Sequence, residues 1–241
     1  DQINIYTTTT ARHDGTAQAV SALSSYRLNP STTDGGIVIS NSYVTITGIE
    51  ILGWGASGYG QGGVYLGESY NIIDSCIVHD EVAGNNAYAI YSQAYGKTGI
   101  SIRNCIIYNA YYGWYDGRGD SGIMTLYNTT IHGCSTRGVS GGYGTKAINV
   151  LSYNNTVDFF WNDTPAGTNY NFSKDATAQG ANSIHGTADG KTPDFVDVGA
   201  GTEDFHLQST SDAIDVGTDL SGTFTTDIDG VTRTGTWDIG A

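Results

Sequence analysis

The chain has little proline and cysteine and few basic residues. Its 241 residues include 3 prolines, 3 cysteines and 10 lysines and arginines, against 24 aspartates and glutamates. Three cysteines cannot form the disulfide framework of a small secreted scaffold. The formal net charge of −14 repels phosphate groups, so we expect neither nucleic acid nor an anionic membrane surface as a partner.

Long apolar and helical segments are also missing. No run of 18 apolar residues occurs, so we expect no membrane insertion. Outside residues 16–26 no sustained run of helix-forming residues has helical spacing, which predicts almost no helix. The chain starts at Asp1 without an initiator methionine or a signal peptide, so Asp1 is expected to be a mature terminus or a fragment boundary.

Glycine, tyrosine and small polar residues are abundant instead. The sequence holds 34 glycines and 17 tyrosines, and 39% of its residues are hydrophobic. Glycine adopts positive φ at chain corners, and asparagine tolerates the left-handed conformation while bonding to nearby backbone. This composition predicts many short strands and tight turns around one continuous core.

Five similar segments recur at a nearly constant spacing. Their first residues are separated by 27, 29, 24 and 26 positions, a period typical of stacked solenoids. In each repeat two adjoining strands are followed by a Gly-rich loop and a third strand. Coils stacked at ~4.8 Å predict an all-β fold, a single-stranded right-handed parallel β-helix. The segments are Gly48–Leu52, Ser75–His79, Asn104–Tyr108, Asn128–His132 and Asn154–Asp158.

Three columns of similar residues follow from this spacing. One column is expected to stack inside the coils and consists of Ile51, Val78, Ile107, Ile131 and Val157. Another contains Cys76 and Cys105, which form either an inert thiol ladder or a disulfide between neighbouring strands. The last lies at a corner, where stacked amides satisfy a left-handed bend, and consists of Asn104, Asn128 and Asn154.

We interpret residues 1–241 as a single domain. Its expected parts are an N-terminal cap (1–36), regular coils (37–161), an irregular last coil (162–192) and an acidic C-terminal cap (193–241). From Asp189 to the end the chain has 11 acidic and 2 basic residues, which indicates a solvated acidic face or divalent-cation binding. Asp227 and Asp229 resemble the start of a Ca²⁺ loop that lacks its final glutamate, so they are the metal candidates. Otherwise we expect no cofactor.

Five short motifs follow the repeats in order, namely Thr192–Val198, Asp204–Leu207, Ser211–Gly217, Asp227–Arg233 and Trp237–Ala241. With the repeats, they resemble the right-handed parallel β-helix repeat proteins of the pectate-lyase-like superfamily, over residues 36–241. That resemblance implies the fold and a location that is extracellular, on the cell surface or on a virion surface, including phage. It leaves the activity open, because the scaffold hosts lyases, hydrolases, adhesins and inert shafts. Within these motifs, the apolar residues expected to plug the last coil are Phe195, Phe205, Leu207 and Ile214.

One group of polar residues could carry catalysis. A carboxylate pair in which one pKa is raised can cleave a glycosidic bond, and acids beside an arginine can bind Ca²⁺ and a uronate. The structural alternative is that the acids accept hydrogen bonds in turns while Arg118 neutralises them. The motifs of the family's galacturonan hydrolases, Gly-His-Gly and Arg-Ile-Lys, are absent. The candidates are His79, Asp80, Glu81, Asp116, Arg118 and Asp120.

Aromatic residues crowd the second and third coils. Aromatic rings with polar tips suit sugar rings and protein interfaces alike. We therefore favour a non-catalytic scaffold, structural or adhesive, that contacts a polysaccharide or cell-surface glycan or binds copies of itself, a homotrimer included. The alternative is a polysaccharide lyase or glycoside hydrolase. The ligand-binding candidates are Trp54, Tyr59, Tyr95, Tyr111 and Trp114.

Overall fold

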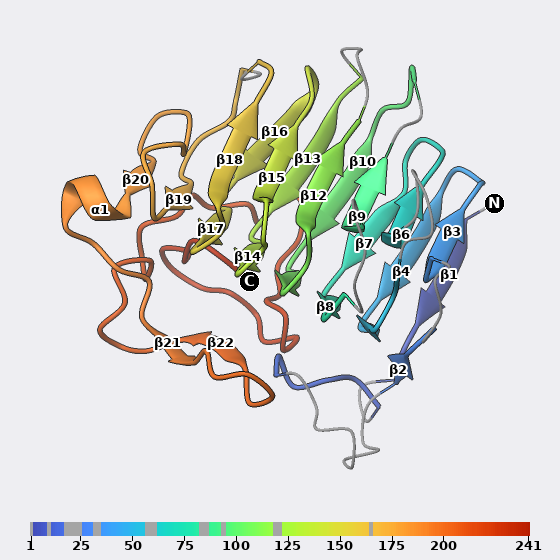
Figure 1. Ribbon diagram of the computed structural model, residues 1–241, viewed down its shortest axis with the longest axis horizontal. Coiled ribbons are helices and arrows are strands. Elements are labelled where there is room, and N and C mark those ends of the chain that lie inside the picture. The colour runs from blue at the N-terminus through green and yellow to red at the C-terminus, as the bar shows by residue number, and fades with distance from the viewer. Residues whose placement is uncertain are drawn as a thin grey trace.

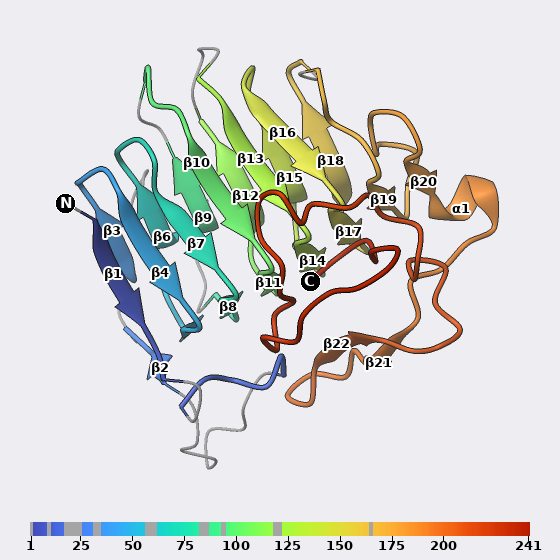
Figure 2. The same ribbon diagram turned by 180° about the vertical axis from the view of Figure 1, so that it is seen from behind.

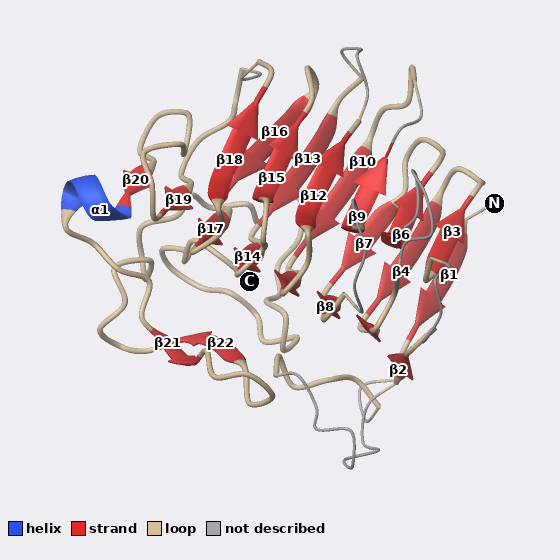
Figure 3. Cartoon of the chain, viewed as in Figure 1, coloured by secondary structure: helices blue, strands red, loops and turns tan. Residues whose placement is uncertain are grey.

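The computed structural model shows a parallel β-helix, which confirms the predicted all-β class (Figure 1). It describes residues 2–8, 11–16, 26–30, 35–55, 62–81, 87–92, 95–117, 122–163 and 166–241. Strands make up nearly all of the regular structure, beside the short helix α1 (Gly186–Asp189) (Figure 3). None of the helices in these ranges is long and apolar enough to cross a membrane.

Three parallel sheets form the walls of the solenoid. Each of the first six coils contributes one strand to each sheet, and in the described residues the last two strands of the second sheet have no counterpart strand in the other two. The first sheet contains β1 (Ile3–Tyr6), β4 (Val44–Thr47), β7 (Ile72–Asp74), β10 (Ile100–Arg103), β13 (Met124–Tyr127) and β16 (Thr145–Ile148). The second contains β2 (Arg27–Leu28), β5 (Glu50–Leu52), β8 (Ile77–His79), β11 (Ile106–Tyr108), β14 (Thr130–His132), β17 (Leu151–Tyr153), β19 (Phe172–Ser173) and β20 (Ile184–His185). The third contains β3 (Ile37–Ile39), β6 (Gly62–Leu66), β9 (Tyr88–Ser92), β12 (Tyr112–Asp116), β15 (Arg137–Gly141) and β18 (Val157–Trp161).

The core is one continuous stack of apolar side chains inside the coils. Ile51, Val78, Ile107 and Ile131 occupy one column, as predicted, and each is fully buried. The predicted cysteine column is also present, and both of its thiols are free and buried. Thiols in this position fill the core and do not cross-link it.

Two columns of residues with positive φ mark the two ends of the second-sheet strands. The column before these strands is Gly48, Ser75, Asn104, Asn128 and Asn149, and the column after them is Gly53, Asp80, Asn109, Gly133 and Asn154.

The predicted register is wrong in the fifth repeat. Asn149, not Asn154, follows Asn128 in the corner column, because the return loop of that coil is short and the two residues are 21 positions apart. Ile131 consequently pairs with Ser152, and Val157 begins β18 in another sheet.

The N-terminal segment differs from the expected cap. β1 pairs with β4 and β2 pairs with β5, so residues before 37 build a first coil in register with the next one. The edge groups of β4 and β5 are therefore satisfied by strands that continue the first two sheets. The short helix expected within residues 16–26 falls largely on positions outside the described residues.

The C-terminal segment does not plug the last coil. After β20 it turns back and runs over the outer face of the second sheet, forming a hairpin of β21 (Phe195–Asp197) and β22 (Asp204–Leu207) on the way (Figure 2). The amide of Asn128 donates hydrogen bonds to the carbonyls of Asp238 and Gly240, both at 2.9 Å. Phe205 packs against Tyr108 of β11, in the middle of the solenoid. The segment is therefore a lateral cover for one flank.

Candidate functional site

The predicted catalytic residues do not form one cluster. Asp80 and Glu81 follow β8 at the corner between the second and third sheets. Asp116 lies at the far end of β12 and is buried, where it accepts a 2.7 Å hydrogen bond from Thr145 of β16. The five residues of β12 separate the two corners by ~13 Å at the usual strand rise. Arg118 and Asp120 lie outside the described residues.

His79 belongs to a buried network of alternating charges. Its Nε2 lies 2.9 Å from Glu50 Oε1, and its Nδ1 lies 3.0 Å from Asp80 Oδ2. Arg27 donates two hydrogen bonds to the same Glu50 carboxylate, at 2.9 and 3.0 Å. Glu50 was not singled out from the sequence, because it sits within an apolar strand and its partners come from neighbouring coils.

The pKa shifts in this network follow from its contacts. Burial alone would lower the pKa of His79, but hydrogen bonds to Asp80 and Glu50 outweigh it and the pKa is raised. Burial would raise the pKa of Glu50, but His79 and Arg27 hold it below its usual value. Both ring nitrogens of His79 are occupied by carboxylates, and these contacts stabilise the protonated ring.

Glu81 has a different environment from its neighbour Asp80. Burial raises the pKa of Glu81 to about 7, although its carboxylate accepts a 2.6 Å hydrogen bond from the Tyr111 backbone N–H. The hydrogen bond from His79 lowers the pKa of Asp80 despite partial burial, and Asn109 contributes in the same direction. Near neutral pH Glu81 is therefore close to its titration midpoint, whereas its neighbour Asp80 favours the ionised form.

The outer face of the third sheet is covered by aromatic side chains, and we call it the aromatic face. Strand pairing aligns Tyr65, Tyr91 and Tyr115 in one outward column, which continues through Ser140 to the exposed Phe160. A parallel column contains Tyr88 and Tyr112, followed by Arg137 and Val157. The inward positions of the same strands are Val64, Ile90, Trp114, Val139 and Phe159.

The rings of the aromatic face contact one another across coils. Tyr65 and Tyr91 have centroids 4.8 Å apart, and Tyr88 stacks on Tyr115 at 4.4 Å. Arg137 lies over the Phe160 ring, 3.5 Å from its centroid. Tyr88 and Tyr91 are buried in this layer, whereas Tyr65, Tyr112 and Tyr115 remain partly exposed. The result is an aromatic surface that crosses β6, β9 and β12, and Ser140 separates its outward column from Phe160.

The predicted ligand-binding aromatic residues do not lie together in the fold. Trp54 and Trp114 are fully buried in the core, because they occupy inward positions, so neither can meet a ligand from solvent. Tyr95 is 69% exposed, and Tyr111 packs edge-on against Tyr112 beside the aromatic face. Tyr59 lies outside the described residues. The sequence prediction missed Tyr65, Arg137 and Phe160, which only the coil-to-coil register identifies as outward.

The predicted metal ligands, Asp227 and Asp229, form hydrogen bonds and an ion pair within the protein. Asp227 accepts hydrogen bonds from the backbone of Asp229 and Val231, which closes a tight turn. Asp229 pairs with Nε2 of His206 at 3.0 Å. Throughout the described ranges, no group of three or more His, Cys, Asp or Glu side chains is arranged to hold a metal ion.

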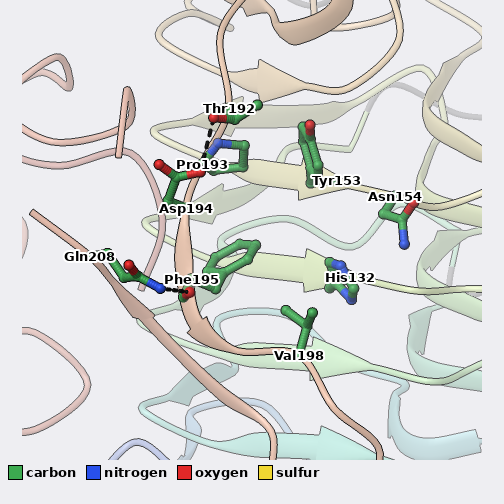
Figure 4. Close-up of a pocket in the computed structure, with 9 residues that line it drawn as sticks. All are labelled: His132, Tyr153, Asn154, Thr192, Pro193, Asp194, Phe195, Val198 and Gln208. Carbon is green, nitrogen blue, oxygen red and sulfur yellow. Dashed lines mark hydrogen bonds between the residues drawn. The ribbon is translucent and has the colours of Figure 1, made fainter. Parts of the chain in front are cut away.

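A cavity of about 430 Å³ lies between the second sheet and the C-terminal segment, and we call it the tail pocket (Figure 4). Its volume is within the usual range for small-molecule sites. The solenoid wall supplies side chains from β14 and β17, and β21 with its flanking residues forms the opposite wall. Its lining consists of His132, Tyr153, Asn154, Thr192, Pro193, Asp194, Phe195, Val198 and Gln208.

Comparison with known proteins concerns the solenoid as a whole. A family model described as a right-handed β-helix region matches residues 35–186, which include every strand from β3 to β20. Among solved structures, the crystal structure of pectate lyase Pel9A is similar, with 12% sequence identity and a TM-score of 0.45 over 99% of this chain and 85% of that chain. No curated protein sequence matches.

Proposed function

Because the chain belongs to the right-handed β-helix family, we propose that it is a non-catalytic scaffold that binds a glycan along its aromatic face. One observation carries this proposal, namely the alignment of Tyr65, Tyr91 and Tyr115 in an outward column that crosses successive coils. Aromatic rings offer an apolar surface to the C–H faces of sugars, and their hydroxyls can bond to sugar hydroxyls. A ladder of such rings suits an extended chain better than a single sugar.

Charge favours a neutral polysaccharide over an acidic one. The net charge of −14 repels uronates and sulfated sugars at a distance. Arg137 does not offset this repulsion of anionic sugars, because its guanidinium is stacked on Phe160 and donates a hydrogen bond to Ser140 Oγ. The proposal includes an extracellular, cell-surface or virion-surface location, since a scaffold of this kind meets polysaccharide there.

Affinity electrophoresis through gels containing neutral or acidic polysaccharides tests the proposal. The wild-type chain should be retarded by at least one neutral polysaccharide, and Tyr65→Ala with Tyr115→Ala should remove the retardation. Tyr143→Ala is the matched control, because Tyr143 is 51% exposed but lies in the loop between β15 and β16. Equal retardation of the double variant and the control would overturn the proposal. Light scattering on the same samples would show whether the aromatic face joins copies of the chain instead.

Asp80 and Glu81 favour a second candidate, a glycoside hydrolase or polysaccharide lyase. A carboxyl with a pKa of about 7 beside an ionised carboxylate is the combination that acid-assisted glycosidic cleavage requires. Both residues lie at the corner that precedes the aromatic face. Release of sugar products by the wild-type chain, lost in Glu81→Gln and retained in Glu68→Gln, would establish this candidate and reject the non-catalytic one.

A further inference from the structure

The tail pocket lies on a different flank from the aromatic face. It is bounded by the outer face of the second sheet, whereas the aromatic face belongs to the third sheet. Three aromatic rings wall it, from His132, Tyr153 and Phe195, and the rings of His132 and Phe195 meet at 85° with centroids 5.8 Å apart. The C-terminal segment thus creates a separate concave site with flat apolar walls.

His132 is the unusual residue of this pocket. It follows His79 and Tyr108 in the same outward column, yet it has none of the carboxylate partners of His79. Its ring packs against Phe195 and Phe205, and neither ring nitrogen forms a hydrogen bond with any described residue. Burial lowers the pKa of His132 to about 4, with a smaller contribution from Lys174. At neutral pH the ring therefore offers one N–H donor and one acceptor nitrogen.

Some of the other polar groups of the pocket form hydrogen bonds within the protein, and others do not. Asp194 accepts hydrogen bonds from the hydroxyls of Thr192 and Thr210, at 2.9 and 2.8 Å. The Nε2 of Gln208 donates to the Phe195 carbonyl, and the Oδ1 of Asn154 accepts from Lys174.

What remains is the amide nitrogen of Asn154, the amide oxygen of Gln208 and the hydroxyl of Tyr153. These groups make no hydrogen bond with the described residues, and all are uncharged. Together with the ring nitrogens of His132, they provide both donors and acceptors around apolar walls.

We propose that the tail pocket binds one neutral sugar ring, held between the aromatic walls by hydrogen bonds from His132, Tyr153 and Asn154. A pyranose presents an apolar C–H face and a rim of hydroxyls, which matches the combination found here. A purely apolar ligand would bury the His132 nitrogens without partners, at a cost in free energy. An anionic ligand would meet the Asp194 carboxylate, and the pocket lining contains no arginine or lysine.

Proton NMR of the assigned His132 ring is a direct probe of the site. The probes are methyl glycosides of glucose, galactose and mannose, with galacturonic acid and glucosamine as charged comparisons. We expect a saturable change in the His132 Hε1 shift with at least one neutral glycoside and none with the charged sugars. Val198→Trp should weaken this binding by roughly tenfold or more, because Val198 lines the pocket and is half-exposed.

Val196→Trp is the matched control for that variant. Val196 is equally exposed and lies two residues away, but it does not line the pocket, so its substitution should leave the titration unchanged. Absence of a saturable shift with every neutral glycoside would overturn the proposal. So would binding confined to galacturonic acid, or wild-type affinity in Val198→Trp. Tyr65→Ala with Tyr115→Ala should not alter the His132 titration, which separates this site from the aromatic face.

Discussion

His79 and Glu50 form a buried ion pair between adjacent coils, with Nε2 and Oε1 2.9 Å apart. Glu50 is fully buried and also holds Arg27, so its removal leaves two cationic groups without their shared partner. We predict that Glu50→Gln lowers the free energy of unfolding by about 3 kcal/mol, the usual scale for breaking a buried pair. Urea denaturation measures the change.

Glu68→Gln is the control for that substitution. Glu68 pairs with Lys97 at 2.6 Å, but both side chains are about a third exposed, so solvent screens the pair. Its loss should change the free energy of unfolding by less than about 1 kcal/mol. Equal effects of the two substitutions would show that the network around His79 does not stabilise the fold.

His206 should make stability depend on pH above neutrality. Its pKa is raised to about 9, first by the hydrogen bond to Asp229 and then by Asp204, against the opposing effect of burial. A raised pKa in the folded state adds stability that is complete below the unfolded value of 6.5 and is lost as pH rises to about 9. The free energy of unfolding should therefore fall across this window, and it should fall less steeply in His206→Gln. Parallel pH profiles for the two proteins would contradict the assignment.

Asn128 should determine how firmly the C-terminal segment is attached. Its amide donates to two carbonyls of that segment and is fully buried. Asn128→Ala should lower the free energy of unfolding by about 2 kcal/mol, because buried acceptors lose their donor. Hydrogen exchange of residues 193–241 should accelerate more than exchange of the coils. Asn162→Ala, at an exposed position, should change neither quantity.

Adding even a methyl group at Gly113 should lower the stability of the fold. A Cβ at this position would lie 2.5 Å from Cγ2 of Ile131 and 2.6 Å from the Gly138 carbonyl oxygen. Gly113→Ala is expected to cost about 2 kcal/mol through overpacking, although Ala89 occupies the equivalent position one coil earlier. Gly113→Ala should cost less in an Ile131→Ala background, because alanine lacks the Cγ2 atom that the new methyl group would meet. An additive double variant would mean that the contact with Ile131 is not the cause.

The sequence predicted the solenoid well, because its core columns depend on local alternation and a regular period. Ile51, Val78, Ile107 and Ile131 could be aligned by counting alone. The predicted register failed in the fifth repeat because asparagine with positive φ occurs at both corners. From the sequence alone, Asn154 could therefore be mistaken for Asn149.

The candidate site was harder to predict than the fold. Its residues depend on contacts between coils and with the C-terminal segment, which no period encodes. In the sequence Glu50 is only one polar residue within an apolar strand, and its ion pairs with Arg27 and His79 become visible only in the structure. Tyr65 and Trp114 look equivalent in sequence, yet one faces outward and the other is fully buried. The direction of a side chain in a strand follows from register, and register requires the neighbouring coil.

The antiparallel bridge between Thr16 and Asp204 connects the beginning of the chain to its end. Stacked-repeat proteins can lose their terminal units one at a time, because each unit contacts only its neighbours. Here the returning segment also contacts coils in the middle, through Asn128 and Phe205. The first coil cannot separate without disturbing the segment that covers the later ones. We therefore expect the domain to unfold in one cooperative transition, with no stepwise fraying from either end.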